Sequence, residues 1–426
     1  MASNAFPASY YAATANPFPR QPSIEGAVEA DVCVVGGGIA GCSTALHLAE
    51  RGYQVALLEG ERIGWGASGR SGGQVLPGFS VAQDKLVRLV GRQTANALWD
   101  ISVEGVALMR ELINRYDIDC DWADGQLSAA IKPRHRDELL AWQEELERDH
   151  AYVGTRMVEG PELRSLVATE RYVAGLFDPH SGHVHPLNYT LGLARAALQR
   201  GVQVYESSRA ESYERQGDRL RVRTARGEVR CRHLALCGNV YLGELGRELQ
   251  SKIMSVGTYV VATEPLGEER ARSLIPNNMA VTDLNWILDY FRRSSDHRLL
   301  FGGRVSYSGI DPNTAQRTRA RMVKVFPQLA DVRIDYSWGG YLDITLNRAP
   351  HFGRLEHDVY FLQGFSGHGI ALTGIGGKLI AEAIAGTAER FDMFARIPHT
   401  GFPGGALLRR PALVLAMLYY RLRDAL

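Results

Sequence analysis

The 426-residue chain is poor in several features, and each shortage excludes a class of protein. Its five cysteines show no metal-ligand spacing, so we expect buried free thiols and a reducing, cytoplasmic setting. No apolar run reaches the roughly 20 residues that span a bilayer, and the first residues lack the basic-then-apolar pattern of a secretion signal. The formal net charge is only +1, which gives no electrostatic reason to expect nucleic acid as a partner.

One apolar segment near the end allows two interpretations. Residues 411–420 are apolar and flanked by arginines on both sides, a pattern that can touch a membrane surface. Such a segment is more often a terminal helix docked on the body of the protein. We therefore favour docking over membrane contact.

The most informative feature that is present is a glycine-rich turn between an expected strand and an expected helix. Strand Val32–Val35 leads into Gly36, which allows a tight turn, and Gly38, which lets the backbone approach a pyrophosphate. Gly41 lets the helix lie close to the strand, and the N–H groups of the helix start favour negative charge. Glu59 ends the next expected strand, where it can bind a ribose hydroxyl and would repel NADP. Together these features predict a dinucleotide site.

Two further glycine-rich stretches lie far from the first along the chain. Residues 62–74 are too small and polar to be core, and residues 364–369 join expected strand Val359–Gln363 to expected helix Leu372–Ala385. The latter stretch repeats the anion-binding arrangement of strand, glycine turn and helix start. Alone it is an ordinary corner. Joined to the other two stretches, it predicts an elongated cofactor gripped at both ends, such as FAD.

The order of expected elements predicts an α/β protein with a discontinuous Rossmann-type FAD-binding domain and an inserted substrate domain of mixed or antiparallel sheet. The expected division is an N-terminal arm at 1–27, the FAD-binding domain at 28–105, 170–250 and 345–426 (the last with the C-terminal tail), and the substrate domain at 106–169 and 251–344. Helices are expected at about Leu86–Tyr116, Pro133–His150, Asn188–Arg200 and Ala315–Phe326. Strands are expected at Val202–Tyr205, Thr258–Thr263, Trp286–Phe291 and Arg298–Gly302, with a hairpin joining Leu220–Thr224 to Val229–Leu236.

Several unlinked segments resemble one family. Besides the glycine stretches, these segments are Ser9–Ala13, Ile118–Asp121, Gly182–Asn188, Ile334–Tyr336 and Phe402–Gly405. They resemble landmarks of the superfamily that contains glycine oxidase, sarcosine oxidase and D-amino-acid oxidase, and most closely its γ-glutamylputrescine oxidases. The resemblance covers nearly the whole chain.

The resemblance implies which residues hold FAD. The residues expected at the pyrophosphate and adenosine are Gly36, Gly38, Ile39, Ala40, Gly41, Glu59, Arg62, Cys237 and Gly238. Those expected along the pyrophosphate and flavin are Ala67, Ser68, Gly69, Arg70, Ser71, Gly72, Gly73 and Gln74. Those expected at the isoalloxazine end are Gly364, Phe365, Ser366, Gly367, His368, Gly369 and Ile370. A helix start facing the flavin pyrimidine would stabilise negative charge on the reduced ring.

Three departures from the relatives bear on the chemistry. No cysteine lies in Trp338–Tyr341, where monomeric sarcosine oxidases attach the flavin, which implies noncovalent FAD. Ala371 replaces a lysine, and no arginine lies between Gly72 and Ala82, so the cations that hold a small amino acid's carboxylate are missing. A lysine that speeds the reaction with oxygen is replaced near Leu300, which makes oxygen use less secure than amine oxidation.

Candidates for the substrate side come mainly from the expected substrate sheet. His368 is the histidine expected nearest the flavin, with catalytic and loop-shaping roles equally open. The aromatic residues that can wall a channel are Tyr259, Trp286, Tyr290, Trp338 and Tyr341, of which Trp286 and Tyr341 join His368 as catalytic candidates. The arginines that can clamp a distal carboxylate are Arg292, Arg293, Arg304 and Arg348, although each alone is more typical of an ion pair.

Three histidines, His180, His183 and His185, lie within six residues and suggest a metal site. Only Asp178 lies near enough in sequence to complete a ligand set, and His185 precedes Pro186 at an expected helix start. We therefore expect no metal.

The expected activity is that of an FAD-dependent oxidoreductase acting on C–N bonds. The resemblance implies oxidation of γ-glutamylputrescine or a related γ-glutamylated polyamine to an aldehyde, with ammonia and hydrogen peroxide released and molecular oxygen as acceptor, in polyamine catabolism. Three alternatives stay open: a dehydrogenase that passes electrons to a quinone or carrier, an oxidase of glycine or sarcosine, and a flavin-binding protein that is not an enzyme.

Overall fold

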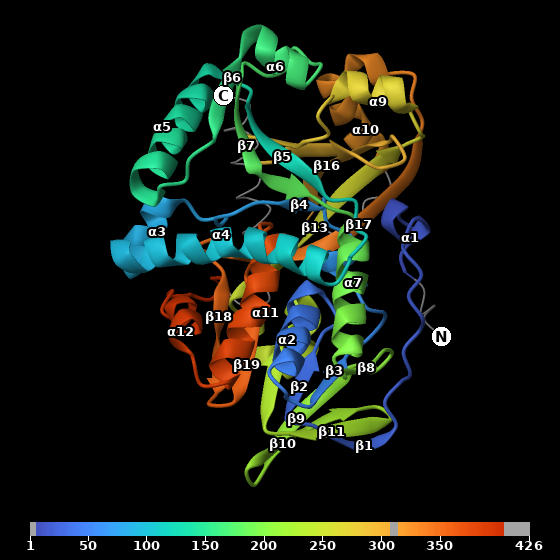
Figure 1. The fold of residues 1–426 in the computed structure, drawn as a ribbon, viewed down its shortest axis with the longest axis vertical. Helices are drawn as coiled ribbons and strands as arrows, with labels where there is room; N and C mark the ends of the chain where they lie inside the picture. The colour runs from blue at the N-terminus through green and yellow to red at the C-terminus, as the bar shows by residue number, and fades with distance from the viewer. Residues whose placement is uncertain (1–5, 307–313, 404–426) are drawn as a thin grey trace.

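Three β-sheets organise residues 6–306 and 314–403, which the computed structural model describes (of residues 304–306 it describes the backbone alone). In Figure 1 the six-stranded sheet lies in the lower half, the nine-stranded sheet in the upper half and the four-stranded sheet at the lower end. Helix α4 (Arg92–Arg115) crosses the middle of the view. This arrangement confirms the predicted fold class.

The six-stranded sheet carries the first glycine turn. Its order is β18–β19–β12–β2–β3–β8, with every neighbouring pair parallel except β18 and β19. The strands are β2 (Val32–Val35), β3 (Val55–Leu58), β8 (Gln203–Tyr205), β12 (His233–Leu236), β18 (His351–Glu356) and β19 (Val359–Gln363). Helices α2 (Ile39–Glu50), α7 (Pro186–Gln199) and α11 (Ile370–Ile384) lie on one face, with α2 between the other two (Figure 1). Strands β2 and β3 are apolar throughout because both faces of the sheet are covered.

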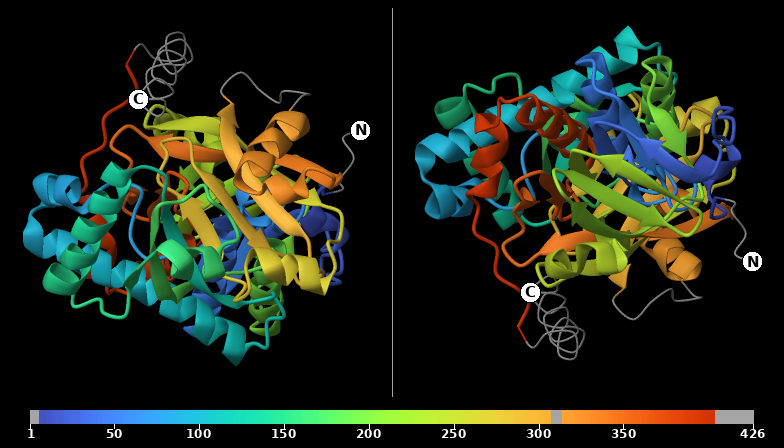
Figure 2. Two further views of the ribbon diagram at one scale, coloured as in Figure 1. Left: turned by 90° about the horizontal axis from the view of Figure 1, so that it is seen from above. Right: turned by 90° about the horizontal axis from the view of Figure 1, so that it is seen from below.

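The four-stranded sheet covers the opposite face. Its order is β1–β11–β10–β9, and its strands are β1 (Gly26–Glu29), β9 (Ala210–Gln216), β10 (Arg219–Thr224) and β11 (Gly227–Cys231). Val222 and Val229 of this sheet share one apolar cluster with Ala56 and Leu234 of the larger sheet. The right-hand view of Figure 2 shows the small sheet from below.

The nine-stranded sheet is mixed, since β14 and β5 pair in parallel while all other strand pairs of this sheet are antiparallel. Its order is β17–β13–β16–β15–β14–β5–β7–β4, with β6 beside β7. The strands are β4 (Gln74–Val75), β5 (Ala123–Ala130), β6 (Arg156–Glu159), β7 (Ala174–His183), β13 (Ile253–Thr263), β14 (Ala280–Asp283), β15 (Asp289–Arg293), β16 (Leu299–Ser306) and β17 (Ile334–Thr345). Strand β7 belongs here, although the sequence division placed residues 170–250 with the FAD-binding domain.

Helices α5 (Pro133–His150), α6 (Gly160–Leu166), α9 (Glu268–Leu274) and α10 (Thr314–Val325) surround the nine-stranded sheet in Figures 1 and 2. The remaining α-helices of the described residues are α1 (Tyr10–Ala13), α3 (Gln83–Val90), α8 (Arg247–Gln250) and α12 (Glu389–Ala395). The bounds predicted for α5 and β19 are confirmed.

Two predictions about helices were wrong in detail. The single helix expected from Leu86 to Tyr116 is two helices, α3 and α4, because Gly91 between them has φ +81°. The arm at 1–27 is not wholly extended: it contains α1, whose start is capped by the Ser9 hydroxyl, and it ends in β1.

Two predictions about strands also need correction. The second arm of the expected hairpin is split at Arg232, so that β11 pairs with β10 while β12 joins the six-stranded sheet. Trp286 lies in a loop, because β15 begins only at Asp289. All five cysteines are buried and free, as predicted.

Candidate functional site

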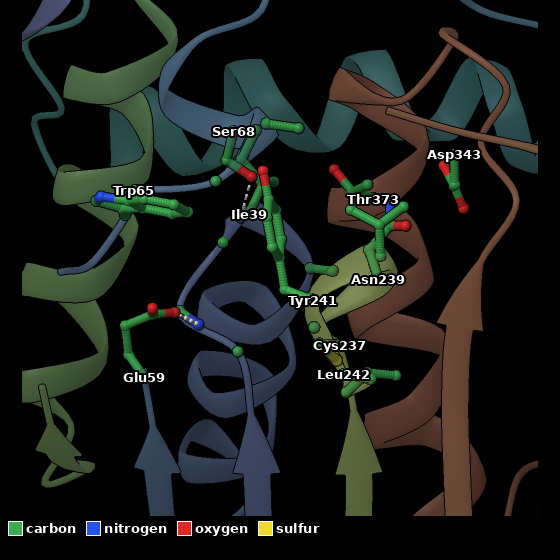
Figure 3. Close-up of a pocket in the computed structure, with 18 of the residues that line it drawn as sticks. Ile39, Glu59, Trp65, Ser68, Cys237, Asn239, Tyr241, Leu242, Asp343 and Thr373 are labelled. Atoms are coloured by element: carbon green, nitrogen blue, oxygen red, sulfur yellow. Dashed lines mark hydrogen bonds between the residues drawn. The ribbon is translucent and has the colours of Figure 1, made fainter. Parts of the chain in front are cut away.

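The three glycine-rich bends meet at one cavity, as the sequence predicts. The first bend contributes Gly36–Ala40, the second contributes Gly66–Ser68 and Ser71, and the third contributes Phe365, Gly367, Gly369 and Ile370. Glu59, Cys237 and Gly238 complete the predicted set on its wall. Figure 3 shows the strands entering from below, with Ser68 near the top of the view, Trp65 at the left and Tyr241 in the middle.

The first bend is built for close approach of backbone. Gly36 has φ +107°, and a Cβ there would lie 2.8 Å from the carbonyl of Cys237. A Cβ on Gly41 would lie 1.8 Å from the Gly36 oxygen, so the helix can pack on the turn only with glycine at this position. At the start of α2 the Ile39 N–H donates to the Ser68 hydroxyl at 3.0 Å (Figure 3).

Glu59 presents a half-buried carboxylate at the end of β3. It accepts hydrogen bonds from the N–H groups of Gly37 (2.6 Å) and Glu61 (2.8 Å), and Figure 3 shows the first of these. Burial raises the pKa of the Glu59 carboxyl, and the two N–H donors oppose that shift. The side chain is therefore fixed where a ribose hydroxyl can reach it.

The cavity wall contains buried polar atoms with no hydrogen-bond partner among the described residues. They include Ser71 Oγ and Asn239 Oδ1. Buried polar atoms are normally paired, so these orphans fit a ligand rich in hydrogen-bonding groups. Together with the glycine cradle and the helix start of α2, they fit the dinucleotide FAD.

The third bend is held by Asp343, a residue that sequence analysis missed. Its buried carboxylate accepts from the Gly364 N–H, and its carbonyl oxygen accepts from the Ser366 N–H at 3.1 Å. Burial raises the pKa of Asp343. A lone acid inside a strand is the only signal in the sequence, and it does not indicate a partner. Tyr241 and Thr373 also line the cavity and were missed.

A second cavity adjoins the first. Five residues line both: Ser71, Leu342, Gly367, Gly369 and Ile370. The predicted cofactor residues Gly72, Gly73, Gln74, Ser366 and His368 line only the second cavity. The two cavities are therefore continuous along these shared residues.

Several predicted cofactor residues contribute by packing outside the cavity wall. Arg62 is paired with the buried Glu206 at 2.9 Å. Arg70 donates to the Trp65 carbonyl at 2.7 Å and lies over its ring. Gly69 and Gly364 allow close backbone contact.

The three catalytic candidates lie in different places. His368 Nε2 donates to the Pro77 carbonyl at 2.9 Å, and burial lowers the pKa of this ring, which favours the loop-shaping role. Trp286 lines the second cavity and is 41% exposed. Tyr341 lines only the first cavity.

The other aromatic candidates divide in the same way. Tyr290 lines the second cavity. Tyr259 is buried, and Trp338 donates its indole N–H to the Arg70 carbonyl at 3.0 Å.

The candidate arginines also differ in position. Arg348 lines the second cavity, with its guanidinium 5.3 Å from the centre of the Trp286 ring. Arg292 is buried and donates to the carbonyls of Gly72 and Val184, so it ties segments together. Arg293 donates to the Pro276 carbonyl. The side chain of Arg304 lies outside the described residues. Arg134 and Glu138 of α5 line the second cavity and were missed.

The three histidines of residues 180–185 point to separate partners. His180 and His183 each donate to a backbone carbonyl, of Val153 and Asn278, while His185 accepts from the Asn188 N–H. Burial lowers the pKa of both His183 and His185 to about 3. Among the described residues no cluster of three His, Cys, Asp or Glu is placed to hold a metal ion.

Within the described ranges no helix is by itself long and apolar enough to cross a membrane; α11 and α12 pass that test only as a pair, bent by 119°. The apolar segment 411–420 lies outside these ranges.

Comparison with known proteins extends these observations. Residues 31–383 match the family described as FAD dependent oxidoreductase (DAO). The chain is 44% identical over 423 residues to gamma-glutamylputrescine oxidoreductase of Escherichia coli, which covers 98% of each chain. It is 40% identical over 420 residues to probable oxidoreductase OrdL of Haemophilus influenzae, which covers 98% of this chain and 97% of the other. The crystal structure of glycine oxidase from Geobacillus kaustophilus shares the fold, with a TM-score of 0.74 and 20% identity over 88% of this chain and 100% of that chain.

Proposed function

Because the chain belongs to the DAO family of FAD-dependent oxidoreductases, we propose that it oxidises the primary amine of γ-glutamylputrescine or a closely related γ-glutamylated polyamine. The observation that carries this proposal is the similarity to gamma-glutamylputrescine oxidoreductase along nearly the full length of both chains. Hydride loss leaves an imine, which water hydrolyses to the proposed products, an aldehyde and ammonia, and hydrogen peroxide forms when oxygen accepts the electrons.

Bound FAD supplies the hydride acceptor for the carbon next to the amine nitrogen. The residues of the first bend and Glu59 would hold its dinucleotide part noncovalently, and the junction between the cavities would hold the ring. The chain's contribution is then alignment and a water-poor site. His368 would position the third bend through its bond to the Pro77 carbonyl, with no proton transfer of its own.

The second cavity supports a long substrate over a small amino acid. Ala371, at the position where relatives carry a lysine, is buried in α11 and supplies no charge. The arginines of the second cavity, Arg134 and Arg348, lie on elements away from that helix. An acid group that is remote from the reacting carbon fits this distribution better than one beside it.

Anaerobic reduction is the direct test. The purified yellow protein is mixed without oxygen with γ-glutamylputrescine, putrescine, sarcosine or glycine, and the visible flavin absorbance is followed. We expect γ-glutamylputrescine to bleach it fastest, and bleaching by sarcosine or glycine instead would overturn the proposed substrate. Admission of air separates the acceptors: rapid reoxidation with peroxide indicates an oxidase, and slow reoxidation indicates a quinone or another carrier.

Bleaching should accelerate toward alkaline pH, because only the uncharged amine donates a hydride.

A further inference from the structure

The outer wall of the second cavity contains an arginine that is fixed over a tryptophan. The Arg348 guanidinium lies 5.3 Å from the centre of the Trp286 ring, and both side chains line the cavity. Arg348 is half-buried, whereas Arg134, the other arginine of this cavity, is exposed at the first turn of α5. An indole face attracts a guanidinium that lies over it and so limits where the side chain points, and the planar fork of N–H donors suits bidentate binding of a carboxylate.

The backbone under Arg348 is held in an uncommon conformation. Its φ is +66°, in the left-handed region that residues with a side chain rarely adopt. The Arg348 N–H donates to the Thr345 carbonyl at 3.2 Å, and the Thr345 hydroxyl donates to the Ala349 carbonyl at 2.7 Å. The Asn347 amide donates to the Pro398 carbonyl at 2.8 Å. These bonds maintain the turn and so fix the point from which the guanidinium extends.

The loop that carries Trp286 is anchored at both ends. Residues 284–288 all line the cavity, and the buried Asp283 carboxylate accepts from the N–H groups of Asn285 (3.1 Å) and Asp289 (3.0 Å). Arg321 also donates to the Ile287 carbonyl at 2.8 Å. The ring on which Arg348 lies is therefore positioned by the fold.

The path along β17 from the junction to the turn that carries Arg348 is comparable to the length of the proposed substrate. Leu342 lies at the junction, and Thr345, which hydrogen-bonds to Arg348, is three residues further along β17, about 10 Å away at the rise of a strand. In extended γ-glutamylputrescine, nine bonds separate the reacting carbon from the α-carboxylate carbon, a span of about 11 Å. One end can therefore reach each place.

We propose that Arg348, oriented by Trp286, binds the α-carboxylate of the γ-glutamyl group and so determines specificity for γ-glutamylated amines; this rests on the proposed function. Putrescine lacks that carboxylate, and its second amine is too close to the reacting carbon to reach the guanidinium. The interaction is remote from the reacting carbon and is made equally before and during hydride transfer. It should therefore act on KM and leave kcat nearly unchanged.

The test compares two substrates and three variants under identical conditions. N-butanoylputrescine has the chain length and amide of γ-glutamylputrescine without its amino-acid head. Loss of a charge-assisted bond predicts that Arg348→Gln raises KM for γ-glutamylputrescine about 10- to 100-fold and leaves N-butanoylputrescine within about 3-fold. Arg348→Lys, which keeps the charge without the fork, should fall between Arg348→Gln and the wild type. Arg134→Gln should change the ratio of the two substrates by less than about 3-fold.

Flavin content per polypeptide shows that each variant is folded. Three outcomes would overturn this assignment while leaving the proposed function standing. Arg348→Gln could raise KM equally for both substrates, or for neither. Alternatively, Arg134→Gln could raise KM selectively for γ-glutamylputrescine. Failure of the wild-type protein to oxidise γ-glutamylputrescine would overturn both, and it is seen before any variant is made.

Discussion

At the scale of single residues, the first glycine turn is the part of the molecule most sensitive to one added methyl group. A Cβ on Gly41 would lie 1.8 Å from the Gly36 oxygen, and this backbone atom cannot move aside without opening the turn. We expect Gly41→Ala to yield protein with little bound flavin and a lower Tm. Flavin absorbance per polypeptide and thermal unfolding measure the two effects.

Gly374 provides the matched control. It also lies in a helix, α11, but a Cβ there would have its nearest contact 4.0 Å away, with a methyl group of Ile39. Gly374→Ala should keep its flavin and gain up to about 1 kcal/mol in free energy of unfolding, because alanine favours the helix. Equal flavin content in the two variants would show that the close contact at Gly41 is not required.

The mode of flavin attachment is a second prediction for individual residues. Cys237 lines the first cavity, and burial raises the pKa of its thiol to about 12, so the thiolate needed for a covalent bond is absent at neutral pH. We expect denaturation followed by ultrafiltration to release all yellow colour into the filtrate. Colour retained with the polypeptide would contradict noncovalent binding.

Residues that act through local spacing could be assigned to the site from the sequence, whereas residues that depend on distant partners could not. Gly36, Gly38 and Glu59 act through local spacing, which a sequence shows directly. Arg62 is directed to Glu206, 144 positions away, and that buried partner has no local signal. Asp343 holds the third bend through backbone donors, and a sequence does not show which N–H groups a carboxylate will meet.

At the scale of elements, the loop 284–288 depends on Asp283. This carboxylate accepts N–H bonds from both ends of the loop, and it is buried. Asp283→Ala should let the loop open more often and raise KM for the amine about 3- to 10-fold, with flavin content unchanged. Steady-state kinetics measure KM, and the flavin spectrum measures the flavin content.

Asp331 provides the control for that change. It is exposed and pairs with Arg270 at the surface, where ion pairs contribute little, so Asp331→Ala should leave KM unchanged. The same KM shift in both variants would argue against a role of the loop.

Elements with strong local signals could be predicted closely. Helix α5 has proline in its first turn and Ala151 in the left-handed conformation at its end, and its bounds agree with the prediction. Gly91 was the visible break between α3 and α4, but glycine also occurs inside helices, so the periodic pattern around it was read as one element. The hairpin arm that changes sheet after Cys231 reflects long-range pairing of β12, which no local pattern reveals.

At the scale of the whole molecule, the parallel sheet explains why distant glycines could be assigned to one site. Carboxyl ends of parallel strands lie at one edge of a sheet, and β2, β3, β12 and β19 are followed by the first bend, Glu59, Cys237–Gly238 and the third bend. The second cavity is different, because α5, the loop 284–288 and β17 come together by sheet pairing and helix docking. Arg348 of the second cavity could therefore be named from the sequence only as one of several candidate arginines.

Two half-buried histidines, His351 and His399, couple the stability of the whole molecule to pH. The rings of His351 and His399 lie 4.2 Å apart beside Lys252, whose ammonium donates to the His399 carbonyl. The pKa of His351 is lowered to about 3, mainly by burial and to a smaller extent by neighbouring positive charge. The pKa of His399 is lowered to about 4, mainly by burial and to a smaller extent by the charge of Lys252. Both rings are therefore neutral in the folded protein at neutral pH.

The sign of the pH effect follows from these directions. An unfolded histidine titrates near pH 6.5, so between about pH 6.5 and 4 the unfolded chain binds a proton that folded His399 does not, and the free energy of unfolding decreases as pH falls. His399→Gln removes this contribution and keeps an amide donor for the Pro350 carbonyl, which His399 contacts at 3.1 Å. Urea unfolding of both proteins at pH 7, 6 and 5 should show the variant gaining on the wild type by about 1–2 kcal/mol across that range. If the two stability curves run parallel, His399 is not kept neutral by the fold.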